Sequence, residues 1–201
     1  FLMSKYPSEL LEIISYFKKL PGVGKKTAER YTFSLFDWSE KELKNLAHSL
    51  EFLKEKITFC SSCFALQTRH SCPFCGDETR DHSLLCIVGS AKDIFAIEDT
   101  HVFRGVYHVI GSLLSPLDGV SPEALNIPHL MDRIKKLSVK EIIIGLDATL
   151  EGDATALYLK NLFQKEGLSV SRLALGLPMG SSLDFVDGGT LSQALAGRRS
   201  Y

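Results

Sequence analysis

The sequence lacks any apolar run close to the roughly 20 residues that a membrane-spanning helix requires, and this absence argues against an integral membrane protein. It also lacks an excess of basic residues, because 23 lysines and arginines are balanced by 24 acidic residues to a formal net charge of −1. That balance excludes a broadly basic nucleic-acid binder. Any contact with nucleic acid must therefore come from a local patch, or from several copies of a weak patch.

Internal repeats and low-complexity segments are absent too, and no signal peptide is expected because Lys5, Glu9 and Glu12 interrupt the first apolar residues. The composition, with 45% hydrophobic and 23% charged residues, is that of a globular chain. Its 201 residues suffice for one or two domains with a real core, plus a small module. We expect a cytoplasmic protein that makes no membrane contact.

Cysteine is scarce, and four of the five cysteines form two closely spaced CxxC pairs, Cys60 with Cys63 and Cys72 with Cys75. Two such turns separated by a short loop bring four thiolates toward one tetrahedral point, which is the ligand set of structural zinc. The alternatives are two disulfides, which need an oxidising compartment, and a redox CxxC, which needs one pair after a strand rather than two in tandem. We predict one structural zinc ion per chain, with no coordination position left for a substrate.

The fifth cysteine, Cys86, lies in the apolar run 84–88 and is predicted to be a small buried core residue rather than a nucleophile. The six histidines are scattered along the chain, and none is predicted to be a metal ligand.

The first part of the chain, residues 5–56, predicts helices from the spacing of its apolar residues. The first helix opens at Ser8, the second begins near Lys25, and the third runs from 40 to 56. Ser39, with a glutamate three residues later, is typical of the capping box that begins a helix.

Between the first two helices, Leu20-Pro21-Gly22-Val23-Gly24 predicts a helix-hairpin-helix turn. Glycines let the backbone approach a ligand closely, and the exposed amides of the next helix suit a DNA phosphate. The alternative is a plain pair of antiparallel helices with a solvated basic face. A phosphate-binding P-loop fits poorly, because Lys19 stands where that motif needs glycine, Lys26 stands where it needs serine or threonine, and no strand precedes it. The candidate DNA-binding residues are Gly22, Gly24, Lys25, Lys26 and Arg30.

After the cysteines the pattern becomes an alternation of apolar runs and helical segments. The predicted strands are 84–88, 106–110, 141–146 and 170–175, and the predicted helices between them are 91–97, 128–137 and 153–165. This alternation indicates a parallel α/β sheet. The end of the chain is rich in loops, with one short helix near 191–195.

Three acidic residues, Asp147, Glu151 and Asp153, follow the third predicted strand, and we call them the acidic loop. Ligands of open α/β sheets bind at such strand ends, and three carboxylates there could hold Mg²⁺. Alternatively, Asp153 caps the following helix and the other two are solvated. Asp184 and Asp187, in a later loop, could join the group. The sequence leaves these alternatives open.

The order of these modules, together with the segments 104–111, 149–156 and 173–180, resembles the RecR family of bacterial recombination mediators over residues 5–198. The resemblance implies a multi-module α/β protein. Its modules are a helix-hairpin-helix at 5–56, a zinc module at 57–80, a Toprim-like domain at 81–176 and a C-terminal arm at 177–201.

The resemblance further implies a non-catalytic, ring-shaped tetramer that clamps DNA and acts in repair with the RecO and RecF proteins. Its task would be to help RecA load on gapped DNA that single-strand binding protein coats. Basic hairpin residues line the ring in the family, which points here to Lys26 and Arg30. The acidic Toprim loop of the family is implicated in partner contact, which points to Asp147, Glu151 and Asp153.

Three departures from the family pattern concern the metal chemistry of Toprim enzymes. Gly89 stands where those enzymes place a catalytic glutamate, and Asp147-Ala148-Thr149 lacks the second aspartate of their Asp-x-Asp. Asp147 itself replaces an asparagine that is usual in the family, which could restore weak Mg²⁺ affinity. The alternative functions are a Mg²⁺-dependent nuclease or primase and a zinc scaffold without DNA contact.

Overall fold

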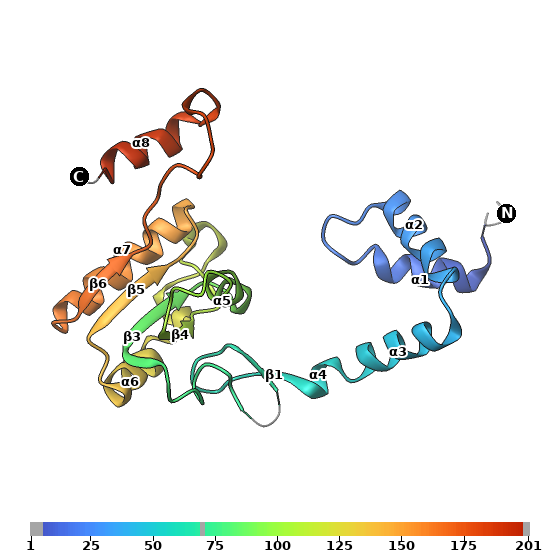
Figure 1. Ribbon diagram of the computed structural model, residues 1–201, viewed down its shortest axis with the longest axis horizontal. Helices are drawn as coiled ribbons and strands as arrows, with labels where there is room; N and C mark the ends of the chain where they lie inside the picture. The colour runs from blue at the N-terminus through green and yellow to red at the C-terminus, as the bar shows by residue number, and fades with distance from the viewer. Residues whose placement is uncertain (1–5, 69–70, 199–201) are drawn as a thin grey trace. The chain divides into compact units, whose positions relative to one another are not determined.

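The structure is a computed structural model that describes residues 6–68 and 71–198. Two compact units make up the chain, Phe1–Lys56 and Ile57–Tyr201, and Figure 1 labels their helices and strands. Lys5, where the first predicted module begins, and residues 199–201 of the predicted arm lie outside the described residues.

The first unit is helical, as its periodicity predicts. Its elements are α1 (Ser8–Phe17), α2 (Lys25–Phe36), α3 (Glu40–Glu51) and α4 (Leu53–Lys56). Helices α1 and α2 pack against each other, with Ile14, Ala28 and Thr32 as their buried residues. The helix-hairpin-helix prediction is confirmed by this pair of helices and the tight turn between them.

Helix α3 begins as expected, because the amide of Ser39 donates to Glu42 at 2.9 Å and the amide of Glu42 donates back to the Ser39 hydroxyl at 3.3 Å. The prediction of one continuous helix over 40–56 is wrong, since Phe52 (φ −95°, ψ 7°) separates α3 from α4. No residue of α3 is buried, so packing does not fix its length. The apolar spacing continues across the break, so periodicity alone does not reveal it.

The second unit contains a four-stranded sheet made of β3 (Asp81–Val88), β4 (Gly105–Val109), β5 (Glu141–Gly145) and β6 (Ser169–Arg172). The strand order is β4-β3-β5-β6, and every neighbouring pair is parallel. This confirms the predicted parallel α/β fold. Cys86 lies at the centre, between Tyr107 and Ile143, and its exposure of 1% confirms that it is a core residue.

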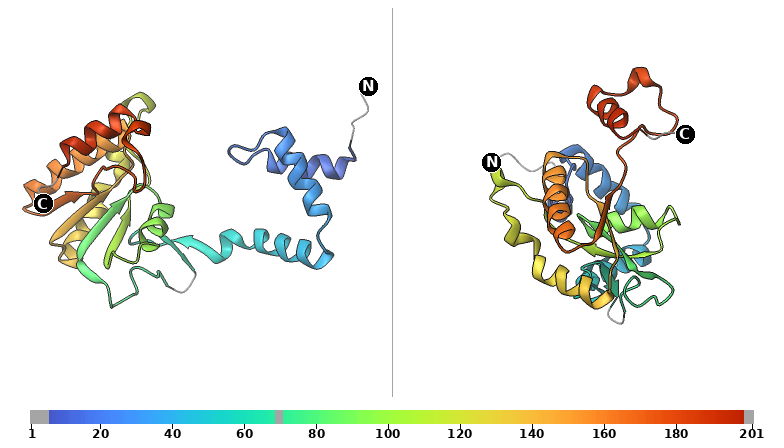
Figure 2. Two further views of the ribbon diagram at one scale, coloured as in Figure 1. Left: turned by 45° about the horizontal axis from the view of Figure 1, so that its top comes forward. Right: turned by 90° about the vertical axis from the view of Figure 1, so that its left-hand side faces the viewer.

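Helices cover both faces of this sheet (Figures 1 and 2). On one face, α6 (Ile127–Leu137) and α7 (Leu150–Lys165) bury an apolar core that includes Leu85, Ile142 and Phe163. On the other face, α5 (Ala91–Glu98) packs through Ile94 against Val88. Strands buried on both faces are continuously apolar, which is why the sequence pattern identified them.

Helix α7 begins three residues before its predicted start. Thr149 is its N-cap, and the Thr149 hydroxyl accepts a hydrogen bond from the Gly152 amide at 3.1 Å. The alternative in which Asp153 caps this helix is therefore wrong. Threonine is a good N-cap residue. Gly152 lets the preceding loop pass close to the helix, because a Cβ at this position would lie 2.0 Å from the carbonyl oxygen of Asp147.

Several short elements are not visible in the sequence pattern. A two-stranded antiparallel hairpin joins β1 (Ile57–Phe59) to β2 (Leu66–Thr68) around the first CxxC. The described residues 6–68 and 71–198 also contain three 3₁₀ helices, η1 (Pro116–Asp118), η2 (Pro122–Leu125) and η3 (Leu183–Phe185). The last helix, α8 (Gly188–Ala196), confirms the short helix predicted near 191–195. No helix in the described part of the chain is both long enough and apolar enough to cross a membrane.

Candidate functional site

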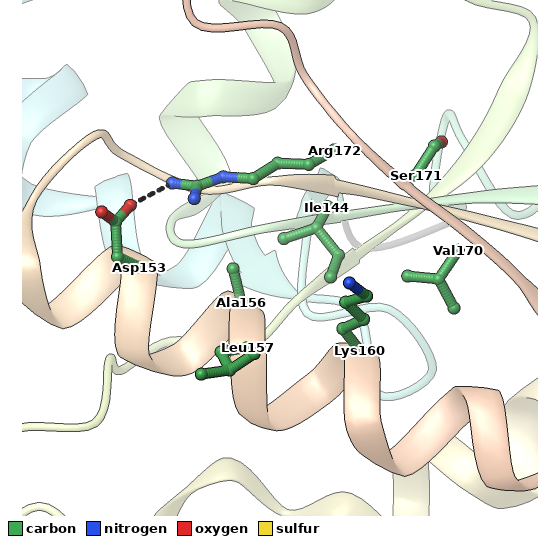
Figure 3. A pocket seen from close by; sticks show the side chains of 8 residues that line it. All are labelled: Ile144, Asp153, Ala156, Leu157, Lys160, Val170, Ser171 and Arg172. Atoms are coloured by element: carbon green, nitrogen blue, oxygen red, sulfur yellow. Dashed lines mark hydrogen bonds and ion pairs between the residues drawn. The ribbon is translucent and has the colours of Figure 1, made fainter. Parts of the chain in front are cut away.

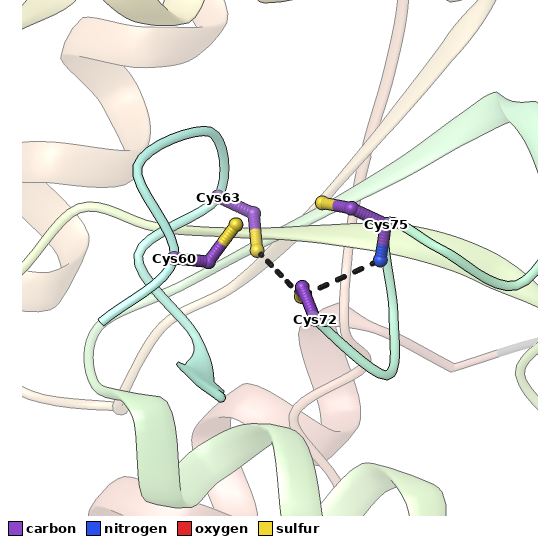
Figure 4. Close-up of side chains that lie close together, drawn as sticks. All are labelled: Cys60, Cys63, Cys72 and Cys75. Atoms are coloured by element: carbon purple, nitrogen blue, oxygen red, sulfur yellow. Dashed lines mark hydrogen bonds between the residues drawn. The ribbon is translucent and has the colours of Figure 1, made fainter. Parts of the chain in front are cut away.

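The four cysteines of the two CxxC pairs come together, as predicted (Figure 4). Their sulfur atoms all lie within 4.8 Å of one another, and the sulfurs of Cys63 and Cys72 are 3.5 Å apart. Tetrahedral coordination with metal–sulfur bonds of about 2.3 Å needs sulfurs about 3.8 Å apart, so the set fits a four-thiolate metal centre. Within residues 6–68 and 71–198, this is the only group of three or more histidine, cysteine, aspartate or glutamate side chains that lie close enough to share a metal ion.

The backbone around the cysteines directs amides at the sulfurs. The amide of Ser62 donates to the sulfur of Cys60, and the amide of Cys75 donates to the sulfur of Cys72, each at 3.4 Å. Phe64 closes the first turn through its amide, which donates to the Cys60 carbonyl at 2.9 Å, and its φ of +60° is rare for a bulky residue. Amides aimed at thiolates stabilise their charge before any metal is considered.

The thiols also affect one another. Hydrogen bonding from Cys63, and next from Cys75, lowers the pKa of the Cys72 thiol, and the contact with Cys72 raises the pKa of Cys63. One member of the set therefore ionises readily, which favours metal binding because thiol ligands must lose their protons. Cys86 is different, because burial raises the pKa of its thiol to about 12 and leaves it unreactive.

The cysteine segment is packed onto the sheet rather than held apart from it. The carbonyl of Cys63 accepts a hydrogen bond from the amide of Val109, in the edge strand β4, at 2.9 Å. Cys63, Ala65 and Phe74 belong to one buried cluster with Tyr107. A metal ion held by the cysteines would therefore be coupled to the stability of this face of the four-stranded sheet.

A polar network ties the end of the cysteine segment to the sheet. The guanidinium of Arg80 donates to both carboxylate oxygens of Glu98, at 2.9 and 2.6 Å, and to the carbonyl of Gly105 at 3.1 Å. The Tyr107 hydroxyl also donates to Glu98, at 2.5 Å. The hydrogen bonds from Arg80 are the main cause that lowers the pKa of Glu98, and the bond from Tyr107 lowers it further. Burial raises the pKa of Tyr107. No local pattern in the sequence indicates this network, because its members are far apart in the chain.

The helix-hairpin-helix turn leaves the start of α2 open. Gly22 has φ +74°, a conformation that favours glycine, and Gly24 is the N-cap of α2 without any side chain that caps the helix. A Cβ at either glycine would meet no atom within 4 Å from any residue beyond its two chain neighbours. Amides in a first helical turn have no partner within the helix, so this turn presents them at an unobstructed surface.

The predicted basic residues lie around this turn. Lys25, Lys26 and Arg30 are exposed, and Lys26 and Arg30 are one helical turn apart on α2. The guanidinium of Arg30 lies 5.6 Å from the ring centre of Tyr31, and Lys19, just before the turn, lies 4.9 Å from that of Tyr16. Open amides beside several cations form a local patch suited to a phosphate.

The acidic loop does not assemble into one metal site. Asp147 is exposed after β5, Glu151 is partly buried, and Asp153 forms an ion pair with Arg172 at 2.6 Å. The three are not among the described groups that could share a metal ion, so the arrangement gives no support to a magnesium ion held by all three. Asp187 is occupied elsewhere, because its carboxylate caps α8 by accepting from the Thr190 amide at 2.9 Å.

A surface cavity of about 280 Å³ lies between α7 and the edge strand β6, and Figure 3 shows its lining residues. Ile144, Leu157 and Val170 form its apolar part, and Lys160 and Arg172 line it with cationic side chains. Sequence reasoning did not identify this cavity, because it depends on how β6 aligns with α7.

Gly89 lies just after β3, at the strand end where Toprim enzymes carry a glutamate. A Cβ at this position would meet Asp93 Oδ2 at 3.5 Å and Leu146 Cδ2 at 3.9 Å, which are ordinary contacts. Packing therefore does not require glycine here, and the strand end carries no acid at this position.

Comparison with known families identifies three parts of the chain. Residues 10–53 match the family described as RecR, helix-hairpin-helix; residues 83–174 match the Toprim domain; and residues 176–199 match RecR, C-terminal. The matches agree with the hairpin and the parallel sheet described above.

Whole-chain relatives agree as well. The chain is 49% identical over 197 residues to recombination protein RecR of Protochlamydia amoebophila, which covers 98% of this chain and 100% of the relative. It is 48% identical to recombination protein RecR of Chlamydia pneumoniae and 49% identical to that of Chlamydia felis, each over 201 residues, 99% of this chain and 100% of the relative.

Proposed function

Because the chain belongs to the RecR family of recombination proteins, we propose that it is a non-catalytic DNA-binding mediator of recombinational repair. It clamps DNA as a tetramer and acts with the RecO and RecF proteins to promote RecA loading on gapped DNA, in the cytoplasm with the chromosome. The observation that carries this proposal is the open start of α2 at Gly24, with Lys25, Lys26 and Arg30 exposed beside it.

The hairpin binds DNA through its backbone phosphates. Gly22 and Gly24 allow close approach, and Lys25, Lys26 and Arg30 supply the charge. Contacts of this kind carry no base specificity and weaken steeply with salt. A few cations in a chain of net charge −1 bind weakly alone, so several copies must face one DNA molecule and gain affinity through effective concentration.

Exposed apolar side chains support the assembly that this requires. In the first unit Leu50 is 62% and Phe36 is 77% exposed, and in the C-terminal arm Phe185 is 90% exposed. Helix α3 is amphipathic, yet none of its residues is buried within the chain. An amphipathic helix whose apolar side is not covered by its own chain is a candidate contact site, and further copies of the chain are the occupants that we propose.

The test is DNA binding by full-length protein carrying Lys26→Glu and Arg30→Glu, measured by fluorescence anisotropy at several salt concentrations. We expect binding to be lost, with metal content and oligomer mass unchanged. The matched control, Lys41→Glu with Lys44→Glu on α3, makes the same charge change in the same unit outside the hairpin. Provided that its oligomer mass is that of the parent, it should bind DNA like the parent. Equal binding by the hairpin variant and the parent would place the DNA site elsewhere.

We assign zinc to Cys60, Cys63, Cys72 and Cys75, because zinc is the ion that favours four thiolates in a closed tetrahedral set. The ion is structural, since no ligand position remains for a substrate. Elemental analysis of freshly purified protein should give one zinc per chain, and a preparation that contains another metal or none would contradict the assignment.

The acidic loop is proposed as a partner surface. Residues 138–153 carry four carboxylates and a single lysine, a field that repels DNA and attracts a basic protein. Asp147, Glu151 and Asp153 are the proposed contacts for RecO.

The alternative function, a Mg²⁺-dependent Toprim enzyme, is favoured by the Toprim match and by Asp147 at the end of β5. Gly89 counts against it, because a general acid or base is worth roughly 10²- to 10⁴-fold in rate. Nicking or primer synthesis that needs Mg²⁺, and that is lost in Asp147→Ala, would replace the mediator proposal with this one.

A further inference from the structure

Helix α6 carries a charged residue on its buried face. Arg133 is 7% exposed, and it lies beside Ile134 and one turn from Leu130 in the face that packs against the sheet. A buried guanidinium is unfavourable unless acceptors and an opposite charge compensate it. None of the carboxylates that the structure describes forms an ion pair with Arg133, so the compensating charge must come from another group.

The contacts of Arg133 identify that group. Its Nη1 donates to the carbonyl of Tyr107 at 2.7 Å, and its Nη2 donates to the sulfur of Cys75 at 3.4 Å. Tyr107 is the fully buried central residue of β4, and Cys75 belongs to the four-cysteine set. Because the guanidinium is a rigid planar fork, one side chain joins the helix, the strand and the metal ligands in a fixed geometry.

The charge of the cysteine set explains why a cation is buried there. Four thiolates around one divalent ion leave a net negative charge in a largely buried position. The amides that donate to Cys60 and Cys72 supply only partial positive charge. A charge-assisted hydrogen bond from a guanidinium is roughly twice as strong as a neutral one, and Arg133 directs it at Cys75.

We propose that Arg133 is a positioning residue of the metal site, which holds Cys75 in place and compensates the charge of the thiolate set so that the ion is retained. The proposal rests on the assignment of zinc to the four cysteines. It also makes metal retention depend on α6 and β4, because the same guanidinium holds the backbone of Tyr107.

The test measures how fast full-length, zinc-loaded protein releases its metal to a chromogenic chelator. Arg133→Met removes the charge and both donors while keeping a long apolar stem. Loss of a hydrogen bond from another residue to a metal ligand typically lowers the affinity for the metal 10- to 100-fold. We therefore expect Arg133→Met to release zinc roughly 10-fold faster than the parent. The matched control is Arg80→Met, which removes a guanidinium that anchors the same segment through Glu98 without touching a sulfur. It lowers the stability of the same face but leaves the thiolate set untouched, so it should release zinc more slowly than Arg133→Met.

A purely structural role gives a different result. If Arg133→Met and Arg80→Met lower the thermal midpoint alike and release zinc at the same rate, the proposal is overturned. If Arg133→Met does not fold, Arg133→Lys decides, since lysine keeps the charge but has no fork to bridge two partners. Faster release by a normally folded Arg133→Lys supports the proposal, and release at the parent's rate overturns the positioning role assigned to the guanidinium fork. A parent protein that carries no zinc refutes the zinc assignment, and this proposal with it, before any variant is compared.

Discussion

The guanidinium of Arg172, on the edge strand β6, lies 2.6 Å from a carboxylate oxygen of Asp153, on α7 (Figure 3). Both side chains remain partly exposed, and such pairs contribute at most about 1 kcal/mol to stability. The pair matters more for the distribution of charge. It neutralises one member of the acidic loop, whereas Asp147 and Glu151 form no ion pair with another described residue.

Binding of the proposed partner, RecO, should therefore depend unequally on the three acids. We expect Asp147→Ala with Glu151→Ala to slow the association of RecO several-fold, because exposed charges act mainly on the association rate. Asp153→Ala alone should have a smaller effect, and DNA binding by the isolated protein should not weaken. Surface plasmon resonance at two salt concentrations measures these rates. An effect of Asp153→Ala as large as that of the double variant would contradict the inequality.

The Arg80–Glu98 pair should contribute stability that depends on pH. Because Arg80 lowers the pKa of Glu98, this contribution is fully present above the unfolded pKa of about 4.3. The contribution is lost as the pH falls through the pKa of Glu98 in the folded protein, which is lower than the unfolded value. We expect Glu98→Gln to reduce the free energy of unfolding at pH 7 by roughly 1–2 kcal/mol, and the difference from the parent to shrink below about pH 4.

Urea unfolding of the parent and of Glu98→Gln between pH 7 and pH 3 measures that difference. Glu78→Gln is the matched control, because Glu78 is an exposed glutamate two residues before Arg80. A difference between Glu98→Gln and the parent that stays constant over this range would show that Glu98 acts by packing rather than by its charge.

Gly152→Ala should damage the fold near the acidic loop. The new Cβ would lie 2.0 Å from the carbonyl oxygen of Asp147, so the loop must move, and overpacking of this kind typically costs about 1–3 kcal/mol. Gly176→Ala is the contrast, because its Cβ would meet nothing within 4 Å in an exposed loop, and its stability should change by no more than about 0.5 kcal/mol. Thermal unfolding compares the two. Equal destabilisation would mean that the loop tolerates the added methyl group.

The four cysteines should differ sharply from Cys86 in their effect on metal content. Cys63→Ser removes a ligand from a set that is buried with Phe74 and Tyr107, so metal should be lost and the thermal midpoint should fall. Cys86→Ser should keep its full metal content, because its sulfur lies outside the set. Metal analysis beside circular dichroism checks both. Full metal content in Cys63→Ser, or loss in Cys86→Ser, would contradict the ligand assignment.

Much of the fold could be predicted because its signals are local. The four central strands are short apolar runs, the glycines of the hairpin turn stand directly before a basic helix, and the CxxC spacing fixes two sulfurs per turn. Each of these features depends on residues only a few positions apart, so spacing and composition are sufficient to identify them. The start of α7 was misplaced because two local signals compete there, Thr149 and Asp153 both being good N-cap residues. The break at Phe52 was missed for another reason, because the apolar spacing continues across it.

The sequence by itself determined the order of the modules, the parallel sheet and the candidate residues for metal and phosphate binding. Only the tertiary structure decided which distant side chains meet: Arg133 with Cys75, Arg80 with Glu98, and Arg172 with Asp153. These pairs join residues that lie 18 to 58 positions apart. Their contacts depend on strand order and on the rotation of each helix against the sheet, and neither is encoded in local periodicity. Burial also decided which charged residues need a partner, because a cation enclosed by the fold is stable only with an opposite charge close to it.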